Sequence, residues 1–203
     1  LDEFPEFHRD VVQALREPLE DGRVSVSRAK GSTLFPAHFM LVAALNPCPC
    51  GKYGSSECSC MPHAIEKYRR KISGPVADRI DMWVHVGAMA PELLTVQTKR
   101  KTGEAEATRT RIHSARELQS ARFKEASGVS TNADMKPRDI EMYANLSKES
   151  EDILMKSAHA MKLSARGFHR TIKVARTIAD LSKSVSINPP HMLEALQYRT
   201  REF

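Results

Sequence analysis

Apolar residues near the start of the chain recur at the spacing of an amphipathic helix. Four of them stand at every fourth position, with charged residues between them: Phe7, Val11, Leu15 and Leu19. This period places the apolar side chains on one face of a helix over residues 7–19. Asp21-Gly22 is a helix-ending pair, so we expect the helix to stop there.

The pattern then changes to alternating polarity, which predicts β-structure. In the segment RVSVSRAKGSTLFPAHFMLVAAL (residues 23–45), the alternation around Val24 and Val26 and the turn residues Lys30-Gly31 predict a hairpin. The apolar run 39–45 that follows is short enough for a fully buried strand.

The rest of the chain is mostly helical in pattern. Residues 63–73 predict a helix, residues 81–87 a strand, and residues from about 102 to 126 a long helix. The stretch ASGVSTNADMKP, which is rich in Ser, Asn and Gly and ends at Pro137, is the clearest linker. Beyond it we expect only helices, with starts marked by Pro137, Ser147, Ser164 and Asn188-Pro189.

These elements predict two parts, a mixed α/β part over residues 1–126 and a helical bundle over residues 127–203. A chain of 203 residues, 41% hydrophobic and 28% charged, suits one large or two small domains that bury a core. The sequence has no apolar run of bilayer length and no basic-then-apolar leader, which argues against membrane and secreted proteins and favours the cytoplasm. The net charge of +6 permits a polyanionic partner without requiring one.

The four cysteines of the chain all lie in the loop 48–60, as Cys48, Cys50, Cys58 and Cys60. Four thiolates are enough for a tetrahedral structural Zn²⁺ site, and two glycines in the loop permit the tight turns that it needs. His63 is a spare ligand. The alternatives are reduced cysteines without a metal and a disulfide across the loop. We expect a metal here to shape the loop and to take no part in catalysis.

Several long blocks of the sequence resemble the AAA+ ATPases, and within them the magnesium-chelatase-like family of the ComM/YifB type. The blocks are LDEFPEF, ALREPLEDG, NPCPCG, KISGPVADRID, SARGFHRTIKVARTIADL and EALQYR. They are spread over essentially the whole chain. The resemblance implies a truncated AAA+ core, with a partial parallel sheet, helices and a β-hairpin insertion, followed by a helical-bundle lid domain.

The resemblance also implies roles for three residues around a nucleotide. Asp2 and Glu3 match the Walker B carboxylates, the first for Mg²⁺ and the second for polarising the attacking water. Asn46 matches the sensor 1 position, where an amide at a strand end orients the water and contacts the γ-phosphate. Without the resemblance, the acidic pair is two surface carboxylates and Asn46 merely ends a strand.

Two arginine positions complete the implied site. Arg79 matches the arginine finger, which reaches the nucleotide of a neighbouring subunit. Arg69 and Arg70 are alternatives, although a solvated basic helix face explains them more simply. Arg166 matches sensor 2, which contacts an ATP phosphate. A cation in the first turn of a helix opposes the helix dipole at a cost of about 0.3–1 kcal/mol, and a bound phosphate would remove that conflict. The alternative is a surface arginine that reaches solvent or a nearby carboxylate.

The sequence lacks the P-loop, G-x-x-x-x-G-K-[ST], that such an ATPase needs, because the Gly51-Lys52 pair is followed by Tyr53. In the family the P-loop precedes the Walker B strand, and this chain opens at Leu1 without an initiator methionine. We therefore expect a carboxy-terminal fragment that is inactive alone, from a parent that uses ATP and Mg²⁺.

The hairpin carries the best candidates for contacts to DNA phosphates: Arg23, Arg28 and Lys30. An exposed, soluble sheet edge explains the same residues equally well. The resemblance implies a homo-hexameric ring that hydrolyses ATP to remodel or translocate DNA, with DNA helicase activity as one form of this. Two other functions stay open: the ATPase subunit of a magnesium-chelatase-type complex, and a non-enzymatic, metal-stapled binding module.

Overall fold

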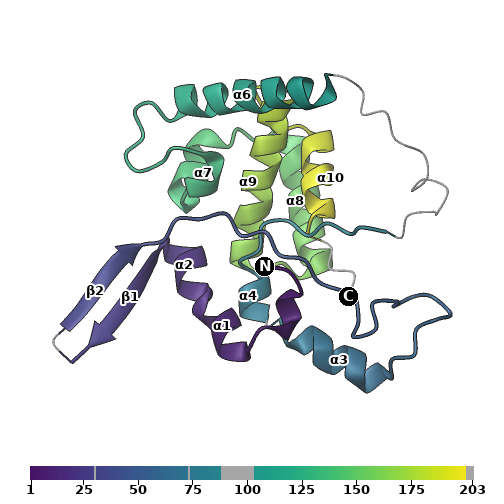
Figure 1. The fold of residues 1–203 in the computed structure, drawn as a ribbon. Helices are drawn as coiled ribbons and strands as arrows, with labels where there is room; N and C mark the ends of the chain where they lie inside the picture. The colour runs from purple at the N-terminus through teal and green to yellow at the C-terminus, as the bar shows by residue number, and fades with distance from the viewer. Residues whose placement is uncertain (30, 73, 88–102, 200–203) are drawn as a thin grey trace. The chain divides into compact units, whose positions relative to one another are not determined.

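A computed structural model describes residues 1–29, 31–72, 74–87 and 103–199 (Figure 1). Contacts divide the chain between Ile80 and Asp81 into two compact units, which we name the first unit and the second unit. The boundary expected at residues 126/127 would separate an ATPase core from its lid. That is a different division, and it stays a prediction.

The first unit opens with η1 (Phe4–Glu6), α1 (Arg9–Ala14) and α2 (Arg16–Asp21). The single helix expected over residues 7–19 is therefore wrong, because it is broken into two at Leu15. Pro18 explains the break, since a proline ring in a helix clashes with the carbonyl four residues earlier, here that of Ala14. The expected end at Asp21-Gly22 is confirmed, with Gly22 at φ 64° as the cap of α2.

The predicted hairpin is confirmed, with β1 (Arg23–Arg28) antiparallel to β2 (Gly31–Pro36). Arg23 lies opposite Pro36 and Arg28 opposite Gly31, so the turn falls where the sequence placed it. This hairpin is the only sheet among the residues that the structure describes. The expected partial parallel sheet is thus not found in them, and the mixed α/β character comes from helices and one antiparallel pair.

The apolar run 39–45 does not form the buried strand that the sequence predicted. Leu1 makes one parallel pair with it, because its ammonium group donates to Val42 O at 2.8 Å and its carbonyl accepts from Ala44 N at 2.9 Å. Strands of a parallel sheet are buried when layers cover both faces. Here Ala43 packs on the core whereas Val42 keeps 69% of its surface exposed, so only one face is covered.

The core of the first unit is small. It consists of Phe4, Val12 and Val76, with Leu15, Ala43 and Ile72 packed against them. Helix α3 (Pro62–Arg70) confirms the helix expected over residues 63–73, and α4 (Gly74–Ala77) follows it. The α3 helix is held to η1 by an ion pair between Lys71 Nζ and Glu6 Oε2 at 2.8 Å.

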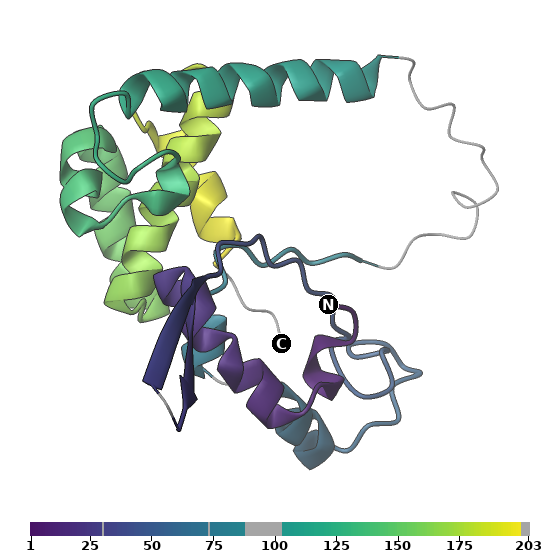
Figure 2. The ribbon, with the colours of Figure 1, turned by 60° about the vertical axis from the view of Figure 1, so that its left-hand side comes forward.

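The second unit is helical in the residues that the structure describes (Figure 2). Its elements are α6 (Glu104–Arg122), η2 (Asn132–Asp134), α7 (Pro137–Tyr143), α8 (Lys148–Met161), α9 (Ala165–Leu181) and α10 (Pro189–Gln197). Helix α10 packs against both α8 and α9, and α6 packs against α9. The long helix expected over about 102–126 and the helical bundle after it are confirmed, whereas the strand expected over 81–87 is not formed.

The helix starts agree with the signals in the sequence. Ser147 Oγ accepts a hydrogen bond from Ser150 N at 3.3 Å, and Ser164 Oγ accepts one from Gly167 N at 3.1 Å. Pro137 stands in the first turn of α7, where its missing N–H is harmless. Among the described helices, none is long and apolar enough to cross a membrane.

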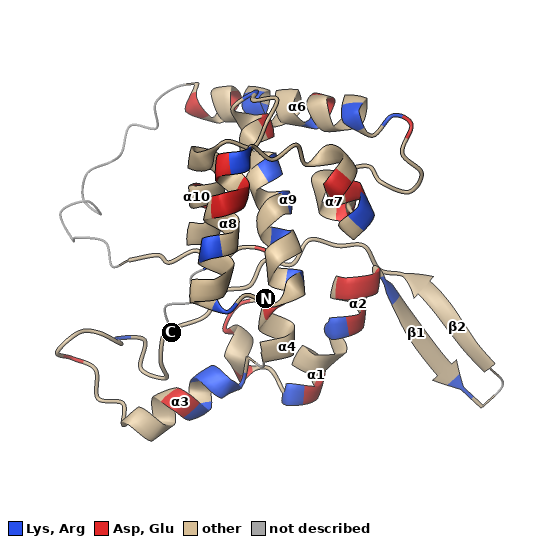
Figure 3. Ribbon diagram, turned by 180° about the vertical axis from the view of Figure 1, so that it is seen from behind, with Lys and Arg blue, Asp and Glu red and all other residues tan. Residues whose placement is uncertain are grey.

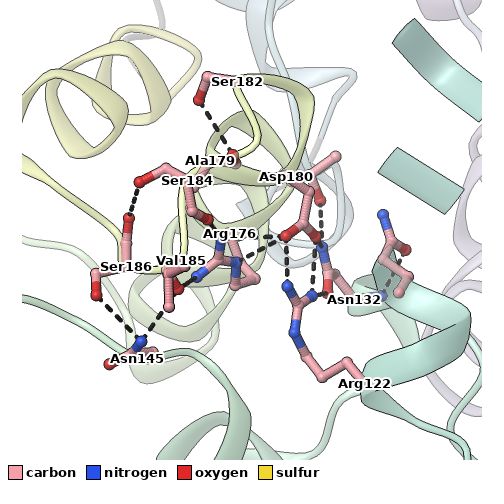
Figure 4. A network of polar contacts seen from close by, with 12 residues as sticks. Arg122, Asn132, Asn145, Arg176, Ala179, Asp180, Ser182, Ser184, Val185 and Ser186 are labelled. Carbon is pink, nitrogen blue, oxygen red and sulfur yellow. Dashed lines mark hydrogen bonds and ion pairs between the residues drawn. The ribbon is translucent and has the colours of Figure 1, made fainter. Parts of the chain in front are cut away.

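A buried ionic network crosses the second unit (Figure 4). Asp180 of α9 is 1% exposed and accepts hydrogen bonds from Arg122 through both oxygens, at 2.5 and 2.8 Å. Arg176 Nε donates to the same carboxylate at 3.2 Å, and Asn132 Nδ2 does so at 2.8 Å. The other nitrogens of Arg176 donate to the backbone carbonyls of Ala144, Ser184 and Val185. The network ties the end of α6, the loop before α7 and the end of α9 together.

Candidate functional site

The acidic pair Asp2 and Glu3 lies at the surface directly before η1. Asp2 Oδ1 accepts a hydrogen bond from Glu3 N at 2.9 Å, and Glu3 has a left-handed backbone with φ 49°. This conformation costs a residue with a side chain about 1–2 kcal/mol, so neighbouring contacts must hold it. Phe4 supplies them, since its side chain is buried and its N–H donates to Ala44 O at 2.9 Å.

Asn46 lies at the same end of the Leu1 pairing as the acidic pair. The two paired segments run in parallel, so Asp2 and Glu3 follow on one side and Asn46 on the other. Asn46 is exposed. It borders a shallow depression lined by Pro5, Leu45, Asn46, Pro47, Tyr68, Arg69 and Ile72.

Tyr68 of α3 is a buried residue at this site that the sequence analysis missed. Burial raises the pKa of Tyr68, and so do the negative charges of Glu6, Cys48 and Glu3, while the backbone of Asn46 acts in the opposite direction. Glu3, Glu6, Asn46 and Cys48 therefore all lie near one hydroxyl. Tyr68 stands three residues after Ile65 and four before Ile72, and this helical spacing is the sequence signal that could have identified it as a buried residue.

Arg79, the expected arginine finger, is turned into the first unit. Its side chain is 7% exposed, and Nε lies 3.0 Å from Glu20 Oε2 on α2. A further nitrogen donates to Pro75 O at 2.6 Å. Of the two alternatives, Arg70 is exposed and paired with Glu66, whereas the Arg69 guanidinium lies 4.5 Å from the centre of the Tyr53 ring. As placed here, the Arg79 guanidinium is held within its own unit by Glu20 and Pro75.

Arg166 is an exposed residue in the first turn of α9, within the second unit. That turn contains no acidic residue. Gly167 beside it is buried, and Arg199 Nη2 would lie 3.3 Å from a Cβ added there. The positive end of the helix dipole and the Arg199 guanidinium thus lie at the helix start that carries Arg166, and such a combination of positive charge favours an anion.

The four cysteines form one cluster, in which every pair of sulfur atoms lies within 4.8 Å. Cys48 Sγ is 3.4 Å from Cys50 Sγ and 3.9 Å from Cys58 Sγ, and Cys50 Sγ is 3.7 Å from Cys58 Sγ. Tetrahedral Zn²⁺ with Zn–S bonds of about 2.3 Å requires sulfur atoms about 3.8 Å apart. The four thiols are free, so the disulfide alternative is not found. These residues could hold a metal, and His63 is outside the cluster.

The thiols differ in their electrostatic surroundings. The pKa of Cys50 is lowered to about 6, chiefly by the backbone N–H of Lys52 and then by the thiols of Cys60 and Cys48. The pKa of Cys60 is raised to about 12, first by its hydrogen bond with Cys50 and then by burial. The glycines Gly51 and Gly54 have φ 77° and 86°, as the tight turns of the loop require.

The basic residues of the hairpin do not share a face. Side chains alternate along a strand, so Arg23 lies on the side of Ser25 and Ser27, and Arg28 lies on the opposite side with Val24. Both arginines are exposed and stand at opposite ends of β1 (Figure 3). Lys30, the third expected contact, lies outside the described residues.

Comparison with known proteins decides the family. Residues 1–94 match the family model described as "Magnesium chelatase, subunit ChlI", and residues 103–199 match "Magnesium chelatase, subunit ChlI C-terminal". The chain belongs to the magnesium-chelatase-like family of the ComM and YifB proteins. The resemblance seen in the sequence is thereby confirmed.

Two relatives show how much of the family this chain covers. Over 200 residues it is 40% identical to Competence protein ComM of Haemophilus influenzae and 38% identical to the uncharacterized protein YifB of Escherichia coli. Each match takes in 98% of this chain but only 38% of the relative. The chain therefore spans less than half the length of these relatives.

Proposed function

We propose that residues 1–203 are the carboxy-terminal part of an AAA+ ATPase that works as a homo-hexameric ring in the cytoplasm and remodels or translocates DNA. The observation that carries the proposal is the parallel pairing of Leu1 with residues 42–44. It places an acidic pair and an amide side chain at the same end of two neighbouring segments. Family membership supports an ATPase, and the name of the relative ComM associates that protein with competence.

In this proposal four residues have roles in binding and hydrolysing ATP. Asp2 takes Mg²⁺, for which its surface carboxylate is suited, and the ion offsets charge on the phosphates of ATP. Glu3 polarises the attacking water and Asn46 orients it. Arg166 binds a phosphate at the start of α9. The P-loop belongs to a segment in front of Leu1, so residues 1–203 alone do not hydrolyse ATP.

Arg79 supplies the remaining cation to the nucleotide of the neighbouring subunit in this scheme. The cysteine loop holds a structural Zn²⁺ that has no part in the chemical step. DNA binds the hairpin through its phosphates, which requires no reading of base sequence. Because Arg23 and Arg28 lie on opposite faces, Arg28, next to the turn, is the residue that we assign to this contact.

Exchange of Glu3 for Gln tests the ATPase proposal. The protein is extended at its amino end to include the P-loop, and ATP turnover is measured for wild type and for Glu3→Gln. We expect turnover to fall by about 10²-fold or more, since a general base contributes that much, while ATP binding is kept. Glu6→Gln is the control, because Glu6 is an exposed carboxylate three residues away that pairs with Lys71. Equal turnover in wild type and Glu3→Gln would contradict the assignment.

A second function is favoured by the two matching families, both of which are named after a magnesium chelatase subunit. In that case the same ATPase core drives Mg²⁺ insertion into a porphyrin with partner subunits, and DNA has no effect on turnover. A non-enzymatic, metal-stapled module would hydrolyse no ATP even with the P-loop in place.

A further inference from the structure

The cysteine loop connects two parts of the depression at Asn46. Cys48 lies two residues after Asn46, and Cys60 lies two residues before Pro62, where α3 begins. We propose that the four thiolates hold one Zn²⁺ ion that fixes the position of Asn46 by joining these two ends of the chain. The metal site stands on its own geometry, and the catalytic consequence rests on the proposed function.

The arrangement of the sulfur atoms fits one shared metal better than two disulfide pairs. A disulfide brings two sulfur atoms to about 2.05 Å and leaves each bonded to a single partner. Here Cys48 and Cys50 each lie 3.4–3.9 Å from two other sulfur atoms. An all-thiolate set with tetrahedral spacing selects a soft or borderline ion, of which Zn²⁺ is the common structural case.

The loop buries little of its surface. Between Pro49 and Ser59, every residue is exposed except Cys58, which is partly buried. Cys48 is fully buried and is the one ligand anchored in the unit. Burial of so little apolar surface does not offset the conformational entropy that the loop loses when it becomes ordered. A metal ion that joins its two ends therefore contributes directly to the stability of the ordered loop.

Two contacts connect the cysteine loop to residues that line the depression. The Asn46 amide group lies 3.8 Å from the place where a Cβ on Gly51 would stand, so this side chain lies beside the loop. The Tyr53 ring lies under the Arg69 guanidinium of α3 at 4.5 Å. Because Tyr68, Arg69 and Ile72 line the depression with Asn46, closing the loop fixes both of its sides.

The metal itself is tested on residues 1–203 without ATP. We expect one Zn²⁺ per chain by elemental analysis, and Co²⁺ in its place should give the intense visible absorption of tetrahedral thiolate coordination. Cys58→Ser should lose stoichiometric metal, whereas His63→Ala should keep it because His63 is outside the cluster. Wild-type protein without bound metal, and unable to take up Zn²⁺ or Co²⁺ when reduced, would overturn the proposal.

Amide hydrogen exchange tests the link to Asn46. Chelation of the metal should speed exchange about 10-fold or more at residues 44–48 and in α3, because these segments then open locally. Amides of α8 to α10 are the internal control and should not change. Metal binding with unchanged exchange around Asn46 would overturn the positioning role. These outcomes do not depend on ATP turnover, so a failed ATPase assay with an intact metal site would reject only the proposed function.

Discussion

Asp180→Ala should lower the free energy of unfolding of the second unit by about 3–5 kcal/mol, because removal of one partner strands buried charge. The carboxylate accepts four hydrogen bonds from three side chains. Arg176 has an exposed fraction of 0%. Without the Asp180 carboxylate, its remaining partners are the neutral backbone carbonyls of Ala144, Ser184 and Val185. Burial already lowers the pKa of Arg176, in the direction expected where a site disfavours a charged guanidinium.

Urea denaturation followed by circular dichroism measures this effect. Asp152→Ala is the matched control, because Asp152 is an exposed helical carboxylate 3.6 Å from Lys148 Nζ. Such a surface pair contributes about 0.3–0.5 kcal/mol. Asp180→Asn keeps the shape of the side chain and should fall between the two. A loss below about 1 kcal/mol for Asp180→Ala would mean that water or a shifted partner satisfies the arginines.

Arg79→Ala should lower the ATP turnover of the P-loop-containing ring by about 10³-fold or more, the effect of a missing arginine finger. Arg79 is also buried against Glu20, so loss of folding must be separated from loss of catalysis. Glu20→Gln weakens the same ion pair and leaves the guanidinium in place. A finger predicts that only Arg79→Ala loses turnover, whereas a purely structural residue predicts that both variants lose it.

Mixing of subunits gives a readout that a structural role would not produce. Arg79→Ala subunits keep Glu3, and Glu3→Gln subunits keep Arg79, so a mixed ring pairs an intact water-polarising site with a finger from its neighbour. We expect turnover to reappear on mixing two inactive variants. No recovery in rings shown to be mixed would contradict action of Arg79 across the subunit interface.

Local signals in the sequence were enough for most of the second unit. Ser147 and Ser164 cap the helices that they were expected to begin, because a cap depends on the few residues after it. The hairpin was found for the same reason. Strands over 39–45 and 81–87 were wrongly predicted, since an apolar run becomes a buried strand only if other segments pair along its length and cover both of its faces. Val42 and Val84 remain 69% and 68% exposed.

The candidate site also contains features that local sequence predicts and features that it does not. The cluster of four thiols could be predicted from cysteine spacing alone, because all four cysteines lie in one short loop. The positions of Tyr68 and of the Arg79–Glu20 pair depend on contacts between segments far apart in the sequence. The Asp180 network joins α6 to α9 across 58 positions of sequence, which no local pattern encodes.

The central claim is that ATP hydrolysis by the P-loop-containing protein is coupled to DNA. The measurement that tests it most directly is ATP turnover with and without branched DNA, for wild type and Arg28→Ala. We expect that DNA raises wild-type turnover and that Arg28→Ala reduces this response while basal turnover stays unchanged. Loss of one phosphate contact should also lower the salt dependence of DNA binding by about one unit of slope. Robust ATP turnover that does not change with DNA would contradict this claim and favour the chelatase-type function. No ATP turnover at all would contradict it as well and favour the non-enzymatic binding module.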